Sequence, residues 1–363
     1  MVIVQVFIGT KAQYVKTAPL LRLMDERRVP YRLIDSGQHA SLSRQLRREL
    51  SVREPDLLLG GNDDIISIPG ALAWSARLAT RLASRRRLQR EVFGGTGGIC
   101  VVHGDTPSTL LSTLMARRAG LQVAHLEAGL RSHSLLNPFP EELIRIVVMR
   151  LSHVLFAPDE TAVRNLRAMN LGRRVVPTSG NTVVDALRYS LRDTPVAPEG
   201  SVVATMHRVE NLHRRSRVEG FVSLLERISA RWPVRLVLHG PTTAALRERG
   251  DLRRLEHLGV VTQQLAPHAE FTRLLAAAPL VITDGGSIQE ECALLGVPTL
   301  LWRAHTERPD GIGRNVVIAS YDRRRIDPVV ADPEMIRRPP AFDKAEPTAE
   351  ILDVLCERIH RFG

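Results

Sequence analysis

The sequence is short of several residue types, and each shortage excludes a class of protein. Aromatic residues make up only 4% of the 363 residues, too few for the aromatic and basic surfaces that bind single-stranded nucleic acid. No apolar stretch approaches the roughly 18 to 20 residues that a membrane-spanning helix needs. The three cysteines, Cys100, Cys292 and Cys356, are odd in number and lack the spacing of metal ligands. Neither a disulfide framework nor a metal site is therefore predicted.

Lysine is scarce as well, although the chain is basic. The formal net charge is +11, but the chain has only three lysines, and its many arginines are spread along the sequence. We interpret the runs Arg85–Arg87 and Arg323–Arg325 as solvated faces, and we expect no nucleic-acid partner. A basic surface raises encounter rates with small anions such as a nucleotide diphosphate. The start of the chain, MVIVQVFIGTKAQ, lacks the pattern of a signal peptide, so we expect a cytoplasmic protein that binds no membrane.

Short apolar runs alternate with helix-like segments along the whole chain. Val2–Ile8, Ile99–His103 and Val234–Gly240 are examples of such runs, and their alternation with helical patterns predicts parallel sheets with crossover helices. The length favours two domains. The proline-rich segment Asp193–Gly200 follows the junction that we expect between two doubly wound halves.

Three other segments carry secondary-structure predictions. Leu57–Ile68 is polar and broken by glycine, so we expect a loop there. Ala71–Leu88 has the pattern of one amphipathic helix that ends in arginines, and Pro347–Phe362 has the pattern of a final amphipathic helix. The glycines around Thr96 do not fit G-x-G-x-x-G and are interpreted as a turn.

Charged side chains follow the strands of the stretch Val101–Glu142. Asp105 comes after one apolar run and Glu127 after the next, and Glu141 opens the following helix. The carboxyl ends of parallel strands form the edge at which ligands bind. Three carboxylates at such an edge favour proton transfer chemistry over packing. Arg131 lies in the loop between them and is expected to bind substrate.

Two turns have the character of phosphate sites. Two of the three lysines, Lys11 and Lys16, follow the turn at Gly9 that ends the first predicted strand. The N-terminus of the helix that starts there attracts anions. The alternative is that both are exposed lysines on a first helical turn. In the second half, the turn Asp284–Ser287 joins a strand to a helix. Glu291 lies one turn into that helix, where it would accept hydrogen bonds from ribose hydroxyls or simply complement the dipole.

Two histidines follow predicted strands. His207 stands with Arg208 at the end of the first strand of the second half, and histidine is the side chain most easily tuned to hold a proton near neutral pH. A structural role for His207 is the alternative. His39 follows the strand Tyr31–Ser36, where it would contact ligand or cap the next helix.

The motifs together resemble the UDP-N-acetylglucosamine 2-epimerase family. The family patterns GTRPExIK, GDTxS, HxEAGLR, PFPEExNR, GNTxxDAL, T-x-HRxEN, TDSGGxQEE and TTERPE appear here in order. They read GTKAQYVK (9–16), GDTPS (104–108), HLEAGLR (125–131), PFPEELIR (138–145), GNTVVDAL (180–187), TMHRVEN (205–211), TDGGSIQEECALLGVP (283–298) and HTERPD (305–310). Departures from the patterns include Lys11 for arginine, Ile144 for asparagine, and Gly285 for serine with Ser287 two positions later.

The resemblance implies an α/β fold of two Rossmann-like domains of the GT-B type, with the active site in the cleft between them. The N-terminal domain would span residues 1–182, and the C-terminal, UDP-binding domain would span residues 183–345. A helix over residues 346–363 would pack back on the N-terminal domain. The implied acid–base residues are Asp105, Glu127, Glu141 and His207. The implied diphosphate ligands are Lys11 and Lys16, and the nucleotide contacts are Arg208, Phe271, Gly285, Gly286, Ser287, Glu291 and Arg308.

The activity implied by the resemblance is interconversion of UDP-N-acetylglucosamine and UDP-N-acetylmannosamine, or of a related UDP-2-acetamido sugar. UDP would leave by anti elimination to give 2-acetamidoglucal and would then add back, with no metal and no cofactor. The alternatives are a hydrolysing 2-epimerase that releases N-acetylmannosamine and UDP, a GT-B glycosyltransferase, and a protein that only binds the nucleotide sugar. A homodimer is the family expectation.

Overall fold

The computed structural model describes residues 2–38, 40–60, 68–134, 140–192, 200–306, 308–342 and 345–360. The chain forms two compact units. We call residues 1–186 and 345–363 the N-terminal unit and residues 187–344 the C-terminal unit. The division falls within helix α8, Val183–Leu191. Each unit is a parallel sheet with helical crossovers, which confirms the predicted fold class.

The sheet of the N-terminal unit has the strand order β3-β2-β1-β4-β5-β6-β7. Its strands are β1 (Val2–Ile8), β2 (Tyr31–Asp35), β3 (Leu57–Leu58), β4 (Gly97–His103), β5 (Gln122–Leu126), β6 (Val154–Ala157) and β7 (Arg174–Pro177). Its helices are α1 (Lys11–Glu26), α2 (Ala40–Glu49), α3 (Ile68–Thr80), α4 (Arg85–Arg87), α5 (Pro107–Ala119), α6 (Glu141–Leu151), α7 (Glu160–Ala168) and α16 (Pro347–His360).

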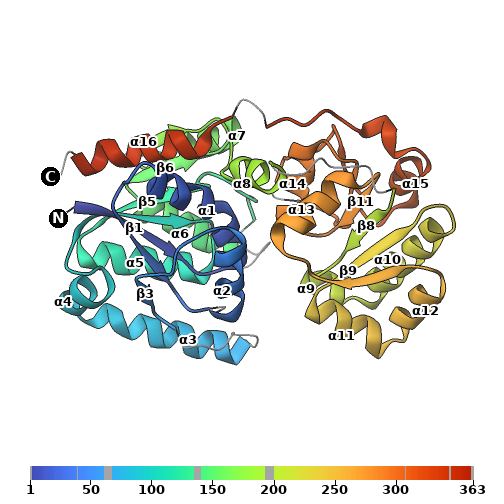
Figure 1. Cartoon of the computed structure of the whole chain (residues 1–363), viewed down its shortest axis with the longest axis horizontal. Coiled ribbons are helices and arrows are strands. Elements are labelled where there is room, and N and C mark those ends of the chain that lie inside the picture. Colours follow the sequence, from blue (N-terminus) through green and yellow to red (C-terminus); the bar gives the residue numbers. More distant parts are fainter. Residues whose placement is uncertain are drawn as a thin grey trace. The chain divides into compact units, whose positions relative to one another are not determined.

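Alternate side chains of the central strands enter two different cores. Val4 and Val6 of β1 pack into one cluster with Leu352 and Leu355 of α16, while Phe7 of the same strand packs into the other. A strand that is apolar on both faces is typical of a parallel sheet covered by helices on both sides. Helix α16 packs against α1 and so covers part of one face (Figure 1).

The C-terminal unit repeats this architecture with the strand order β10-β9-β8-β11-β12-β13. Its strands are β8 (Val202–Thr205), β9 (Val234–Leu238), β10 (Val261–Gln264), β11 (Val281–Thr283), β12 (Thr299–Leu301) and β13 (Val316–Ile318). Its helices are α9 (Val209–Leu212), α10 (Arg215–Ser229), α11 (Gly240–Glu248), α12 (Asp251–His257), α13 (His268–Ala277), α14 (Gly286–Leu295) and α15 (Arg323–Ala331). Phe221 and Trp302 meet edge to face in its core, with ring centroids 5.8 Å apart.

Two predicted segments differ from the structure. Leu57 and Leu58, expected in a loop, form the short edge strand β3 beside β2. The helix expected over Ala71–Leu88 starts at Ile68 and ends at Thr80, and shorter 3₁₀, α and π turns follow it up to Val92. Ser84 is the cause of one break, because its backbone is extended and its hydroxyl caps the N–H of Arg87.

Within the described ranges, no helix is both long enough and apolar enough to span a membrane. Arg85–Arg87 and Arg323–Arg325 are all exposed, which confirms their interpretation as solvated faces. His39, the first residues of the PFPEELIR motif and Glu307 of the HTERPD motif lie outside the described residues.

Candidate functional site

Two turns of the N-terminal unit are held together by one side chain, that of Gln13. Its amide oxygen accepts hydrogen bonds from the backbone N–H groups of Gly9 (2.7 Å) and Thr10 (3.1 Å). Its amide nitrogen donates to the carbonyl oxygen of His103 (2.7 Å) and to the hydroxyl of Thr109 (2.8 Å). The turn that leads to Lys11 and the turn that carries Asp105 are thereby joined across neighbouring strands β1 and β4.

The same two turns approach so closely that Gly9 has no room for a side chain. A Cβ atom at Gly9 would lie 2.3 Å from the Ser108 hydroxyl oxygen and 2.8 Å from that of Ser36. A glycine is required wherever backbone comes this close to other atoms. The glycine of the GTKAQYVK motif therefore brings the start of α1 against the start of α5.

Glu127 is held in a buried cluster at the end of β5. Lys16 donates to its Oε1 at 2.8 Å, and both side chains are less than a tenth exposed. Asn181 donates to the same oxygen at 2.9 Å, and His103 Nδ1 lies 3.7 Å from Oε2. Glu127 also adopts a positive φ of 63°, which is uncommon for a residue with a side chain and concentrates at functional sites.

Asp105 belongs to a chain of alternating charges that runs to helix α6. Arg145 donates to Asp105 and, at 3.1 Å, to Oε2 of Glu142. Arg131 donates to Oε1 of Glu142 at 2.5 Å. Burial alone would raise the pKa of Glu142, but the hydrogen bond and charge of Arg131, together with the Ser132 N–H and Arg145, hold that pKa below its usual range.

His125 is a buried histidine that contacts the turn before Asp105. It is fully buried at the end of β5, and its Nε2 lies 2.8 Å from the carbonyl oxygen of Gly104. Burial, with a smaller contribution from the Arg145 charge, lowers the pKa of His125 to about 4. A neutral imidazole this close to a carbonyl donates from Nε2, so His125 fixes the backbone of the turn before Asp105.

The remaining predicted residues of the N-terminal unit are Glu141 and Lys11. Glu141 is partly buried on the first turn of α6, and its Oε2 is buried without a hydrogen-bond partner among the described residues. Lys11 is the first residue of α1, after the capping box formed by Thr10 and Gln13. The structure thus places Lys16 beside Glu127, and Asp105 with Arg131 on one ion-pair chain.

In the C-terminal unit, hydrogen bonds to Asp284 hold the turn that follows β8. Its carboxylate accepts hydrogen bonds from the backbone N–H groups of His207 (3.0 Å) and Arg208 (3.0 Å) and from Nδ2 of Asn211 (2.9 Å). The Arg208 side chain pairs with Glu210 at 3.0 Å. His207 and Arg208 are therefore tied to the DGGS turn, because β8 and β11 are neighbours in the sheet.

The other predicted nucleotide residues lie on α13, α14 and the loop after β12. Gly285 is the N-cap of α14, Gly286 and Ser287 are its first residues, and Glu291 is buried on its second turn. Arg308 pairs with Glu290 at 3.0 Å. Phe271 is buried on α13, which packs against α14. Gln289 donates to the carbonyl oxygens of Arg308 and Asp310 and so shapes that loop.

Several residues that shape the site received no role from the sequence. They are Gln13, His103, His125, Arg145, Asn181, Asp284 and Gln289, and all stand inside or directly beside the quoted motifs. Their signal was a polar residue at the end of an apolar run or one helical turn from a carboxylate. Some partners are distant in the sequence, such as His103 for Gln13 and Asp105 for Arg145, so those pairs had no sequence signal.

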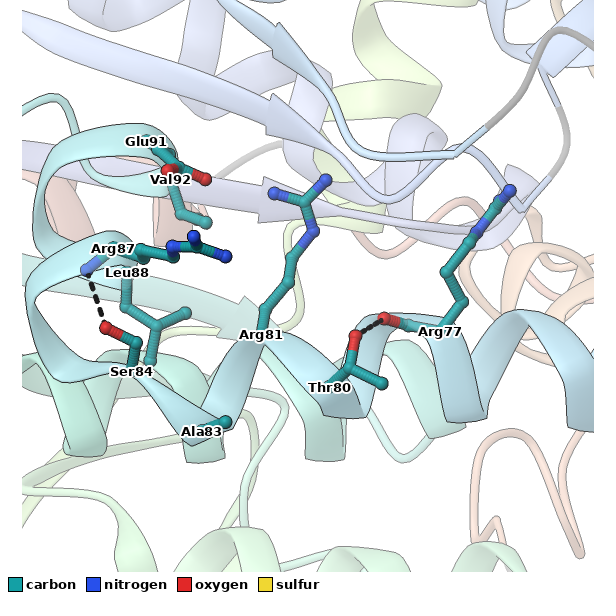
Figure 2. A pocket seen from close by; sticks show the side chains of 9 residues that line it. All are labelled: Arg77, Thr80, Arg81, Ala83, Ser84, Arg87, Leu88, Glu91 and Val92. Atoms are coloured by element: carbon teal, nitrogen blue, oxygen red, sulfur yellow. Dashed lines mark hydrogen bonds between the residues drawn. The ribbon is translucent and has the colours of Figure 1, made fainter.

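A separate cavity of about 300 Å³ lies beside α3 and the turns that follow it. Figure 2 shows Arg77, Arg81 and Arg87 around it, with Glu91 nearby. None of the predicted site residues lines this cavity. It is a basic surface feature of the N-terminal unit and is distinct from the clusters around Glu127 and Asp105.

Comparison with known proteins identifies the family. A family model described as UDP-N-acetylglucosamine 2-epimerase matches residues 22–334. The chain belongs to the UDP-N-acetylglucosamine 2-epimerase family. The family's UDP-N-acetylglucosamine 2-epimerase from Methanocaldococcus jannaschii is 26% identical over 343 residues, covering 89% of this chain and 90% of that protein.

Relatives with a different named substrate also match this epimerase-family chain. The UDP-2,3-diacetamido-2,3-dideoxy-D-glucuronate 2-epimerase of Pseudomonas aeruginosa is 29% identical over 328 residues, covering 86% of this chain and 87% of that protein. The crystal structure of the Methanocaldococcus jannaschii enzyme in complex with UDP-GlcNAc and UDP matches with a TM-score of 0.81 and 24% identity, over 98% of this chain and 99% of that one. This structural likeness establishes the GT-B-like fold of the epimerases.

Proposed function

We propose that the chain interconverts UDP-N-acetylglucosamine and UDP-N-acetylmannosamine, or a related pair of UDP-2-acetamido sugars, without hydrolysis. The observation that carries this proposal is the pair of carboxylates, Asp105 and Glu127, each held by a cation at the ends of neighbouring strands β4 and β5. Family membership supports the reaction class. The four proposed acid–base groups are Asp105, Glu127, Glu141 and His207.

The chemistry accounts for the number of acid–base groups. No carbonyl adjoins C2 of an N-acetylhexosamine, so its proton is not acidic. Anti elimination across C1–C2 removes that proton while UDP leaves and gives 2-acetamidoglucal. UDP then adds back to C1 as a proton reaches the opposite face of C2, which inverts that centre. Proton carriers on both faces are therefore needed, and carboxylates in distinct environments can serve as base and acid.

The local partners suit Glu127 and Asp105 to different parts of this cycle. Lys16 and Asn181 both donate to Glu127 and so favour its ionised form, as a base requires. Asp105 is about a quarter exposed and pairs with Arg145. Arg131 reaches the same ion-pair chain through Glu142 and is proposed to orient the sugar.

The proposed UDP contacts come from both units. Lys11 and Lys16 are proposed near the diphosphate, although Lys16 also neutralises Glu127. The start of α14, with its backbone N–H groups and positive dipole end, suits a phosphate group. The proposed nucleotide contacts are Arg208, Phe271, Gly285, Gly286, Ser287, Glu291 and Arg308. Cationic groups near the diphosphate would stabilise the charge that develops as UDP leaves.

One experiment tests the reaction and separates its alternatives. The protein is incubated in heavy water with UDP-N-acetylglucosamine and, separately, with UDP-2,3-diacetamido-2,3-dideoxy-D-glucuronate, and the anomeric proton signals are followed by NMR. We expect UDP-N-acetylmannosamine with deuterium at C2. Free N-acetylmannosamine and UDP would instead identify a hydrolysing epimerase. UDP release that depends on an added acceptor would identify a glycosyltransferase, and absence of turnover with every UDP-sugar would refute the proposal.

We also propose that the protein works as a cytoplasmic homodimer without a metal or cofactor. Light scattering coupled to size-exclusion chromatography measures the mass against that of the 40.4 kDa chain. Turnover that persists in the presence of a metal chelator supports the absence of a metal requirement. A monomeric mass at working concentration would overturn the proposed assembly.

A further inference from the structure

Three ionisable side chains stand in a row at the carboxyl ends of adjacent strands of the C-terminal unit. His239 follows β9, His207 follows β8 and Asp284 follows β11, and these strands are neighbours in that order. The rings of His207 and His239 stack with centroids 4.7 Å apart and an angle of 32°. On its other side, His207 has its Nδ1 3.4 Å from Oδ1 of Asp284.

Asp284 is rigidly placed for this contact. Its side chain is fully buried, and its two oxygens accept three hydrogen bonds, from the backbone N–H groups of His207 and Arg208 and from Asn211. Asn211 is itself buried and donates also to the carbonyl oxygen of Trp302 (3.0 Å). A carboxylate fixed by so many donors presents one constant charge to the imidazole beside it.

Gly285 leaves the space that the His207 ring occupies. A Cβ atom at position 285 would lie 2.7 Å from Cε1 of His207, which is closer than a Cβ atom approaches other atoms in proteins. The backbone of Gly285 is extended, with φ −82° and ψ 123°, a conformation that any residue adopts. A side chain at position 285 would therefore displace the imidazole of His207 from its observed position, while the backbone itself would not be strained.

We propose that Asp284 is the positioning residue for His207, and that glycine at position 285 permits the ring to lie between Asp284 and His239. The Nδ1 atom of His207 lies within ion-pair distance of the carboxylate, at 3.4 Å, and this attraction favours the ring orientation in which Nδ1 faces Asp284. The nearby charge also favours the imidazolium form, which suits stabilisation of a departing diphosphate. That last step rests on the proposed function; the positioning does not.

Two glycine substitutions form a matched test of the positioning. Gly285→Ala adds the methyl group that meets His207, whereas Gly240→Ala adds one at the same sheet edge, where nothing lies within 4 Å of the new Cβ. The readouts are the ¹⁵N signals of the His207 ring, identified with His207→Asn, and kcat and KM for the UDP-sugar. We expect Gly285→Ala to shift the ring signals and to lower kcat about 10-fold, less than the roughly 100-fold or more that the loss of an acid–base group costs, with KM little changed. Gly240→Ala should change neither.

A second variant tests the carboxylate. Asp284→Asn keeps the size of the side chain and removes the charge 3.4 Å from His207. A carboxylate at that distance favours the charged imidazole, so we expect the NMR titration midpoint of His207 to fall by about one pH unit when the charge is removed. His239, whose ring stacks on His207, and the neighbouring ion pair Arg208–Glu210 are unchanged in this variant.

The outcomes are decisive in each case. Unchanged His207 ring signals in Gly285→Ala would overturn the role of Gly285, and an unchanged midpoint in a folded Asp284→Asn protein would overturn the role of Asp284. If Asp284→Asn does not fold, the Gly285→Ala comparison decides the positioning alone. If the native chain turns over no UDP-sugar, the proposed function fails, but the NMR comparison still judges the positioning.

Discussion

The two units fix their important carboxylates by different means. In the N-terminal unit, Glu127 and Asp105 are paired with the charged side chains of Lys16 and Arg145. In the C-terminal unit, the hydrogen bonds to the fully buried carboxylate of Asp284 come from two backbone N–H groups and one neutral amide. The first arrangement depends on the side-chain cations Lys16 and Arg145, and the second on neutral hydrogen-bond donors, with His207 Nδ1 3.4 Å away.

This difference predicts two kinds of sensitivity. Removing one member of a buried ion pair leaves the other charge uncompensated, which is strongly destabilising. Removing one of several neutral donors costs about one hydrogen bond and the desolvation of the group left behind. The N-terminal site should therefore respond steeply to changes of charge, and the C-terminal site more to changes of shape.

The largest effect is expected from Lys16→Met. This change leaves Glu127 buried without its ammonium partner, so we expect the free energy of unfolding to fall by about 3–5 kcal/mol, measured by urea denaturation. The exposed pair Arg27–Asp353 provides the control, because Arg27→Met should cost less than about 1 kcal/mol. The double variant Lys16→Met with Glu127→Gln should recover much of the loss; equal losses in the single variants at positions 16 and 27 would contradict the comparison.

The next effect is a pH dependence that arises from His125. Its pKa is about 4 in the folded protein and about 6.5 in an unfolded chain, so the unfolded state binds more protons between these values. Stability is then complete above about pH 6.5 and falls as the pH drops toward 4, by about 3 kcal/mol in total. Urea denaturation at several pH values measures this loss. In His125→Asn the slope over this window should be shallower, and an identical slope would refute the assignment.

The third effect comes from Asp105 and Glu127, the carboxylates proposed to be catalytic. Asp105→Asn and Glu127→Gln should each lower turnover at least about 100-fold, the usual scale for acid–base groups, while calorimetry shows that UDP still binds. Glu91→Gln is a matched control, because Glu91 is an exposed carboxylate beside the separate cavity of Figure 2. Near-normal turnover in both catalytic variants would refute their roles.

The smallest effect is expected in the C-terminal unit, from Asn211→Ala. Asp284 keeps its two backbone donors, but the change also removes the hydrogen bond from Asn211 to the Trp302 carbonyl and the one from the Tyr321 hydroxyl to Asn211. Because the deleted amide is itself uncharged, we expect the free energy of unfolding to fall by about 1–3 kcal/mol. The same urea measurement applies. A loss greater than that of Lys16→Met would show that neutral donors matter as much as paired charges and would remove the distinction between the units.

The sequence predicted the parts of the molecule whose signals are local. The strand predicted over Val2–Ile8 has the observed bounds of β1, and the alternation of apolar runs and helices predicted two parallel sheets. Asp105 and Glu127 stand after strands β4 and β5, as expected from the ends of the apolar runs. Apolar periodicity reports such features because each depends only on residues close in sequence.

The pairings between distant residues could not be predicted in this way. Gln13 bonds to His103, and His207 meets Asp284, because β1 lies beside β4 and β8 beside β11. No local pattern gives the order of strands in a sheet. The break at Ser84 was missed for a different reason: its hydroxyl caps the N–H of Arg87 at a single position, while the surrounding arginines continue a helical pattern.

Helix α16 has a consequence for the order of events during synthesis. Ile351, Leu352 and Leu355 belong to the same core as β1 and α1, yet the ribosome makes them after the whole of the C-terminal unit. Domains generally fold as units, from the N-terminus onward, while the chain grows. Here the segment made first stays without part of its core until residues 347–360 have emerged, so the nascent chain can complete its C-terminal unit before its N-terminal one.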